Sequence, residues 1–159
     1  MAHKIIIEDA HIKFRNFRGI ASTFNKEGDR NFCVDVDHEL AEKLTQDGWL
    51  VKYSKPRNPS DEPQPYIKVK VSYRYTQPKV VLISSEGRTL LDEETIGTLD
   101  WADIEKVDVV ITPSYYEFNG RTGISAYLKS MYVTVEEDDL EKKYARDGMR
   151  DYVPSHFDE

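Results

Sequence analysis

Basic and aromatic side chains alternate in three short segments of this chain, at residues 11–18, 49–53 and 73–75. Cationic groups neutralise phosphates, and flat rings stack on unpaired bases for about 1–3 kcal/mol per contact. Both groups are needed to hold a single nucleic-acid strand without reading its sequence. The spacing therefore predicts single-stranded DNA as the ligand.

The candidate contact residues are the cations and rings in and near these segments. The alternative is that Phe14, Phe17 and Phe32 fill the protein interior while the lysines and arginines only solvate its outside. Ten Tyr, six Phe and two Trp are many rings for one small core, which favours some of them lying outside. The predicted DNA-binding residues are Lys13, Phe14, Arg15, Phe17, Arg18, Trp49, Lys52, Tyr53, Lys68, Lys70, Tyr73, Arg74 and Tyr116.

The net charge of −7 at first argues against a polyanionic ligand, but its distribution does not. Residues 136–159 hold nine acidic and four basic side chains, so the rest of the chain is nearly neutral. Residues 52–88 are rich in lysine and arginine, whereas residues 92–108 are acidic. The sequence thus predicts a basic face on a binding domain at 1–135 and an acidic tail at 136–159.

The tail ends with Phe157, Asp158 and Glu159, an aromatic anchor beside acidic groups. Such a segment is often a mobile, solvating extension. It can also compete for a cationic groove, or place its aromatic end in a pocket of a partner protein. We expect these three residues to contact a partner.

Two acidic clusters could hold a divalent cation: Asp35, Asp37 and His38, and the run 92–94. A metal-dependent nuclease is therefore an alternative. Simpler roles exist for both, since Asp37 can cap a helix and the second cluster lies in a polar connection. The sequence contains no phosphate-binding glycine loop, zinc-protease motif or nucleophile elbow. We expect a protein that is not an enzyme and needs no metal or cofactor.

Strand patterns dominate the chain. Residues 5–7 and 14–20 are predicted to form one long curved strand, followed by a turn at 25–29 and a strand at 31–36. A short helix is expected between the N-cap Asp37 and the C-cap Gly48. Residues 49–53 resume as strand, and the proline-rich stretch 54–65 is a loop.

The second half begins with residues 66–75, which alternate between an apolar side and a basic side. Strands are expected at 78–83 and 107–111, with a short helical or irregular acidic connection at 92–105. Residues 115–135 should form a hairpin around Asn119 and Gly120, a pair suited to a type I′ turn. Many strands with one or two short helices favour a mainly β, antiparallel barrel of one domain.

No apolar run could cross a bilayer, and the first residues do not resemble a secretory signal, so we expect a cytoplasmic protein that does not contact membranes. The single cysteine, Cys33, excludes an internal disulfide and is expected to be buried.

A recognisable pattern of residues is found in segments 14–17, 28–32, 47–52, 90–92, 99–101, 119–124 and 126–129. In these segments the chain resembles the single-stranded DNA-binding proteins of tailed bacteriophages, which share an oligonucleotide-binding (OB) barrel. The resemblance implies an OB-fold-like domain that coats DNA during phage replication and recombination in the bacterial host. It also implies that the tail contacts phage or host replication proteins. The bacterial housekeeping relatives end in Pro-Phe, whereas Asp158 and Glu159 follow Phe157 here.

Two points stay open at the level of sequence. A structural or protein-interaction barrel of the virion would explain the strands without DNA binding. Association of the chain into a homo-oligomer is neither required nor excluded by the pattern.

Overall fold

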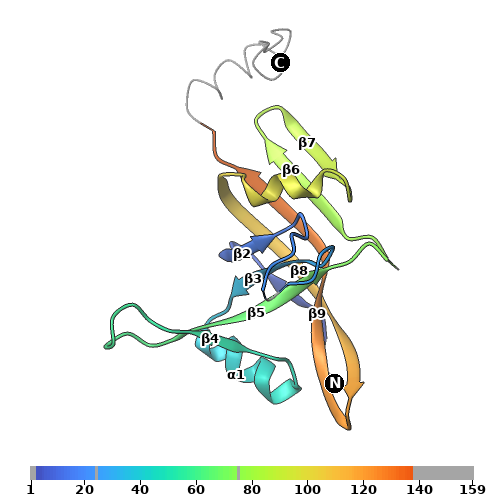
Figure 1. Ribbon diagram of the computed structural model, residues 1–159. Coiled ribbons are helices and arrows are strands. Elements are labelled where there is room, and N and C mark those ends of the chain that lie inside the picture. Colours follow the sequence, from blue (N-terminus) through green and yellow to red (C-terminus); the bar gives the residue numbers. More distant parts are fainter. Residues whose placement is uncertain (1–2, 24, 75, 138–159) are drawn as a thin grey trace.

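The computed structural model describes residues 3–23, 25–74 and 76–137 (Figure 1). Strands make up most of this part of the chain, with one α-helix and one 3-10 helix. The elements are β1 (Ile5–Ile7), β2 (Ile12–Asn16), β3 (Arg30–Asp35), α1 (His38–Asp47), β4 (Lys52–Ser54), β5 (Gln64–Val71), β6 (Lys79–Ser84), β7 (Gly87–Leu91), η1 (Ile96–Asp100), β8 (Ile104–Phe118) and β9 (Arg121–Val135).

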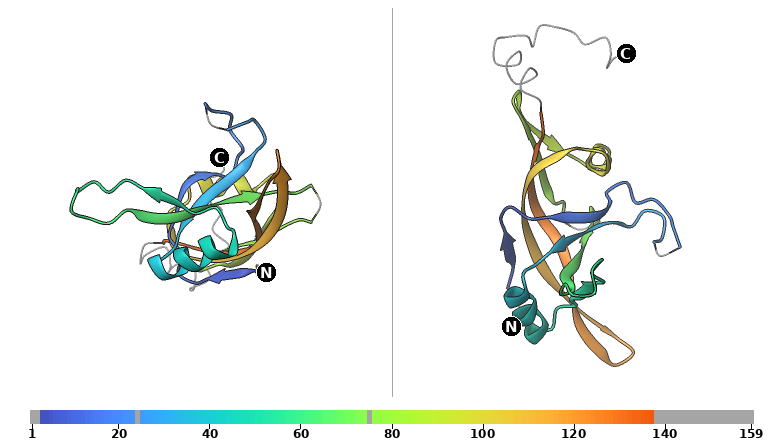
Figure 2. Two further views of the ribbon diagram at one scale, coloured as in Figure 1. Left: turned by 90° about the horizontal axis from the view of Figure 1, so that it is seen from below. Right: turned by 90° about the vertical axis from the view of Figure 1, so that its left-hand side faces the viewer.

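The strands form one sheet in the order β1-β8-β9-β5-β3-β2, with β4 paired to β5, and β6 paired to β9 and β7. Seen from below, the sheet curls around a common interior (Figure 2). Among the described residues the ladder stays open, with β1 and β2 as its ends. The expected mainly β, barrel-like fold class is confirmed. Two pairs, β5–β9 and β6–β9, are parallel, which local patterns did not indicate.

The N-terminal segment is not the single long strand expected from residues 5–20. β1 pairs with β8, whereas β2 pairs with β3 on the other end of the sheet. The break lies at Asp9, which has a φ of 52° and donates its backbone N–H to the Asp108 carboxylate at 2.9 Å. A second turn follows at Gly19, where an added Cβ would lie 3.0 Å from the backbone of Gly28.

Helix α1 begins and ends where the sequence predicts. The Asp37 carboxylate accepts the Leu40 N–H at 2.7 Å, and Gly48 ends the helix with a φ of 103°. The helix buries Ala41 and Leu44. Within the described chain, no helix has the length and apolarity needed to cross a bilayer.

The β8–β9 hairpin is the longest element and projects away from the body, opposite the β6–β7 hairpin (Figures 1 and 2). Asn119 and Gly120 both have positive φ, at 52° and 77°, as a type I′ turn requires. The pairing of β8 with β1 ends at Ile111, and Pro113 lies beyond it in β8. Because Pro113 faces no β1 residue, its lack of an N–H removes no hydrogen bond to β1.

The core lies inside the curled sheet and is apolar. Phe17 and Phe32 are fully buried with their rings stacked, 5.1 Å between centroids. Ile67, Val69 and Val71 point inward from β5, as the alternation predicts. Burial of each such side chain contributes about 1.5–3 kcal/mol. This packing fixes which side chains of the same strands must face outward.

Candidate nucleic-acid interface

The outward side of β5 carries Tyr66, Lys68 and Lys70, each exposed or half-buried between buried neighbours. Because paired residues in adjacent strands point to the same side, the register shows which groups join them. Tyr127 of β9 is opposite Lys70. Cys33 of β3 is opposite both Lys13 of β2 and Lys68 of β5, so Lys13 and Lys68 point to the same side of the sheet. We call Lys13, Tyr66, Lys68, Lys70 and Tyr127 the lysine–tyrosine face.

Lysine ammonium groups lie over rings on this face. The Lys13 Nζ is 4.4 Å from the Tyr66 ring centroid and 5.5 Å from that of Phe14. The Lys70 Nζ is 5.8 Å from the Tyr127 ring centroid. These distances allow cation–π attraction. The Lys70–Tyr127 pair also places a charge for a phosphate beside a ring surface for a base.

Three residues of the face, but not Lys13 or Tyr66, border two hollows. One, of about 550 Å³, runs from the face to the β8–β9 hairpin and is bordered by Lys52 and Tyr116. The other, of about 700 Å³, lies against the 25–31 segment. Lys68, Lys70 and Tyr127 border both, so the hollows form one continuous trough.

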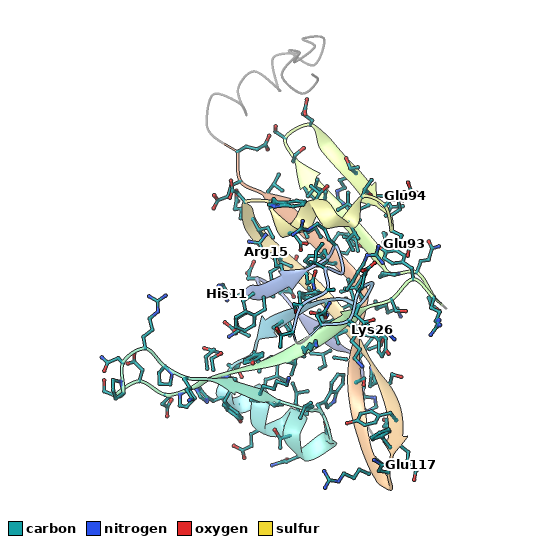
Figure 3. All side chains as sticks on the ribbon, viewed as in Figure 1. His11, Arg15, Lys26, Glu93, Glu94 and Glu117 are labelled. Atoms are coloured by element: carbon teal, nitrogen blue, oxygen red, sulfur yellow. The ribbon has the colours of Figure 1, made fainter. Side chains whose placement is uncertain are left out.

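The trough is not uniformly basic. Glu117 borders it near the far end of the β8–β9 hairpin (Figure 3), and Glu27, Asp29 and Glu93 border the other end. Glu93 is partly neutralised by Arg30, whose guanidinium lies 3.3 Å from its carboxylate. Positive charge is therefore concentrated at the centre, over β5.

Phe14 faces outward because of a backbone irregularity. The β2–β3 register shifts between Lys13 and Asn16, and Phe14 has a φ of 52°, which is rare for an aromatic residue. Its ring is 65% exposed and meets Tyr66 edge to face, with centroids 5.9 Å apart. The bulge thus places Phe14 beside the lysine–tyrosine face.

Two predicted contact rings lie in the core instead. Phe17 is fully buried and Trp49 is 4% exposed, so neither can offer a ring face to a base. Phe17 is one residue beyond β2, where its N–H donates to the Asp100 carboxylate at 2.6 Å and fixes the turn. Trp49 packs at the end of α1 and bridges to Ile124 of β9. Phe17 therefore lies outside the candidate interface, whereas Trp49 borders the hollow of about 550 Å³ without presenting its ring.

Two predicted cations are engaged in structural contacts. Arg15 donates to the carbonyls of Leu99 and Ala102, both at 2.8 Å, which ties β2 to the segment around η1. Arg18 is paired with Asp100 at 2.9 Å and lies 4.0 Å from the ring centroid of Trp101. Neither residue borders the trough hollows.

Lys13 does not border the trough, because its ammonium is paired with the Asp35 carboxylate at 2.7 Å. Four other predicted residues do border it. Lys52, Arg74 and Tyr116 border its hollows, and half-buried Tyr73 does so too. Burial raises the pKa of the Tyr73 hydroxyl, which outweighs the nearby Arg30 charge. Tyr53 is exposed, but it alternates with Lys52 on β4 and so points to the other side of the ladder.

Sequence reasoning missed Tyr127 and Tyr66 as interface residues. The alternation of residues 66–75 places Tyr66 on the same side as Lys68 but does not mark it as a contact residue. Tyr127 lies between the buried Ala126 and Leu128, an alternation that marks an outward position. The parallel contact with β5, which brings Tyr127 to Lys70, has no local signature.

Cys33 lies beneath the lysine–tyrosine face and is buried, as expected. Burial raises the pKa of its thiol, more than the charges of Lys52, Lys68 and Lys13 lower it. Because ionisation is harder in the folded state, the free energy of unfolding should fall as pH rises through the ordinary thiol range.

We expect Cys33 to react with a disulfide reagent at pH 8 at least about 10-fold more slowly in the folded protein than in urea, because the thiolate is the reactive form. Absorbance of the released thiolate measures this rate. Equal rates in the two conditions would contradict the buried placement.

The acidic clusters have other partners. Asp35 lies 2.8 Å from the His11 ring nitrogen and 2.7 Å from the Lys13 ammonium, and Asp37 caps α1. Hydrogen bonds from the Thr95 hydroxyl and N–H lower the pKa of the Asp92 carboxyl. Within residues 3–23, 25–74 and 76–137, no group of three or more candidate ligands is placed to hold a metal ion. The predicted tail contacts Phe157, Asp158 and Glu159 lie outside the described residues.

A family model described as "Putative phage ssDNA-binding domain" matches residues 1–152. The fold is similar to the single-stranded DNA-binding protein from bacteriophage Enc34 in complex with ssDNA, with a TM-score of 0.56, 15% identity, and coverage of 86% of this chain and 88% of that chain. A second structure of the Enc34 protein gives a TM-score of 0.55, 15% identity, and coverage of 89% and 90%. No curated protein sequence matches the chain.

Proposed function

The chain belongs to the family of phage single-stranded DNA-binding domains, and we propose that its lysine–tyrosine face holds the DNA strand without sequence preference. The observation that carries the proposal is the placement of Lys70 beside Tyr127 at the centre of the trough. A phosphate can pair with the Lys70 ammonium while a base stacks on the Tyr127 ring. The solved complex of the Enc34 protein with ssDNA supports the ligand class.

The side chains on this face explain the lack of sequence preference. Lysine contacts to phosphate carry no sequence information, because every nucleotide presents the same phosphate. Tyrosine rings accept any base, because every base has a π face. The side-chain amide of Asn31 is a group able to read base edges, but its N–H groups already donate to the Asn25 side-chain oxygen and to the Asp29 carbonyl.

We propose a role in phage DNA replication and recombination within the cytoplasm of the bacterial host, as a binding protein without catalytic activity. Residues 1–135 would be the DNA-binding domain. The acidic residues 136–159 would be an extension that contacts replication proteins through Phe157, Asp158 and Glu159. The pairing of Asp35 with His11 and Lys13 supports a structural role for that carboxylate over a catalytic one.

The direct test is titration of the protein into fluorescein-labelled oligothymidine, followed by anisotropy. We expect binding that weakens steeply as salt rises and that exceeds binding to a duplex of equal length. No binding at low salt would refute the proposal and favour the virion-barrel alternative.

Replacement of Tyr127 by Ala should weaken oligothymidine binding by about 5- to 150-fold, the equivalent of one lost stacking contact. Tyr127 is at the centre of the trough, with Lys70 above its ring. The same anisotropy titration measures the loss.

Tyr127→Phe is the matched control, because it keeps the ring and removes only the hydroxyl. It should bind within about twofold of the parent, since stacking needs the π face alone. If the Ala variant binds as tightly as the parent, Tyr127 is not a stacking residue.

A further inference from the structure

A second lysine–tyrosine pair lies outside the trough, where β6 runs parallel to β9. The Lys79 Nζ is 5.6 Å from the Tyr132 ring centroid. Lys79 is opposite Ser130 in the β6–β9 register, and Tyr132 is half-buried two residues further along. This pair repeats the arrangement of Lys70 and Tyr127 on the same strand.

A bulge in β9 places the two tyrosines on one side. Tyr127 and Tyr132 are five residues apart, and in a regular strand an odd separation puts side chains on opposite faces. The β8–β9 register shifts between Val110 and Ile111, which inserts Lys129 as an extra residue of β9. Leu128 and Met131 therefore both point inward, and the two tyrosines both point outward. Bulges often re-aim side chains next to functional sites.

A hollow of about 820 Å³ joins the two rings. We call it the β6 hollow. Its cations are Arg74, Lys79 and Lys129, and the described residues that border it include no aspartate or glutamate. In this it differs from the trough, where Glu117 and Glu93 are present. The β6 hollow is thus suited to an anionic, aromatic ligand.

The β6 hollow is continuous with the trough. The β6 hollow shares Tyr127 and Ser114 with the trough hollow of about 550 Å³. It shares Ser72 and Arg74 with the trough hollow of about 700 Å³. A strand lying on Tyr127 can therefore continue toward Tyr132, because both rings border the β6 hollow. Five residues of strand correspond to roughly 16 Å, which is long enough for additional nucleotides.

We infer that the β6 hollow is a second nucleotide subsite, in which a base stacks on Tyr132 while Lys79, Arg74 and Lys129 contact the flanking phosphates. This inference rests on the proposed function and extends it, because it makes affinity depend on the length of the strand. A short oligonucleotide occupies the trough alone. A longer one fills the trough and the β6 hollow together.

The test compares Tyr132→Ala with the parent on oligothymidines of about 6 and about 16 nucleotides, which span the usual range of site sizes for one OB fold. Tyr132→Ala should bind the long strand about 10-fold more weakly and the short strand unchanged. Tyr127→Ala should weaken both, and Tyr132→Phe should weaken neither. Equal affinity of Tyr132→Ala and the parent for the long strand would overturn the inference, as would an equal loss on both lengths.

Lysine acetylation gives a second readout that needs no variant. The long strand should protect both Lys70 and Lys79 from acetic anhydride, whereas the short strand should protect Lys70 alone. Modification of Lys79 that the long strand does not reduce would refute the second subsite. If neither strand bound the parent or protected either lysine, the proposed function itself would fail, which is a distinct result.

Discussion

Replacing Lys68 and Lys70 together by Ala is expected to lower the affinity for oligothymidine by about 100-fold at low salt. Both ammonium groups lie at the centre of the trough, on the outward side of β5. Each charge-assisted contact with a phosphate is worth about 1.5 kcal/mol, or about tenfold in affinity.

The salt dependence distinguishes a contact role from a general charge effect. Each phosphate contact to a single strand contributes about −0.7 to the slope of log K against log salt. The double variant should therefore show a slope smaller by about 1.4, measured by anisotropy over a salt series.

The matched control is the double variant Lys43→Ala and Lys106→Ala. It removes the same charge from exposed positions on α1 and β8 that do not border the trough. It should bind within about threefold of the parent, because distant exposed charges are screened. Equal losses in the two double variants would show that net charge, and not the trough, sets the affinity.

Phe17→Ala is expected to destabilise the fold by about 3–5 kcal/mol, the usual loss for a buried phenylalanine. The ring is fully buried and stacks on Phe32, so its removal leaves a cavity in the core. The free energy of unfolding, from urea denaturation followed by circular dichroism, measures the loss.

Phe14→Ala provides the contrast within the same segment. Its ring is 65% exposed, so the free energy of unfolding should change by less than about 1 kcal/mol. Oligothymidine affinity should nevertheless fall, because Phe14 adjoins Tyr66 on the binding side. If Phe17→Ala left stability unchanged and weakened binding, the assignment of the two rings would be reversed.

These two phenylalanines show what local sequence can and cannot predict. The pattern of residues 11–18 marks a mixture of cations and rings, but it does not say which ring faces the core. That choice depends on the bulge at Phe14 and on the turn fixed by Asp100, a residue more than 80 positions away. Local sequence likewise does not show that Trp49 is 4% exposed or that its backbone bridges to Ile124 of β9.

Features with strict local rules were predicted well. The alternation on β5 correctly separated Lys68 and Lys70 from Val69, and the caps of α1 and the Asn119–Gly120 turn are also as expected. The parallel pairing of β9 was not foreseen, because it joins strands more than 50 residues apart. Tyr127 enters the interface only through that pairing.

The central position of β9 also constrains how the protein is made. It pairs with β8, β5 and β6, so three ladders require residues 121–135. During synthesis, residues 121–135 are translated after all the other strands of the described chain. Until then the apolar sides of the earlier strands stay exposed to solvent, and contacts of such long sequence separation form slowly. The acquisition of the native sheet is therefore a late event in the synthesis of the chain.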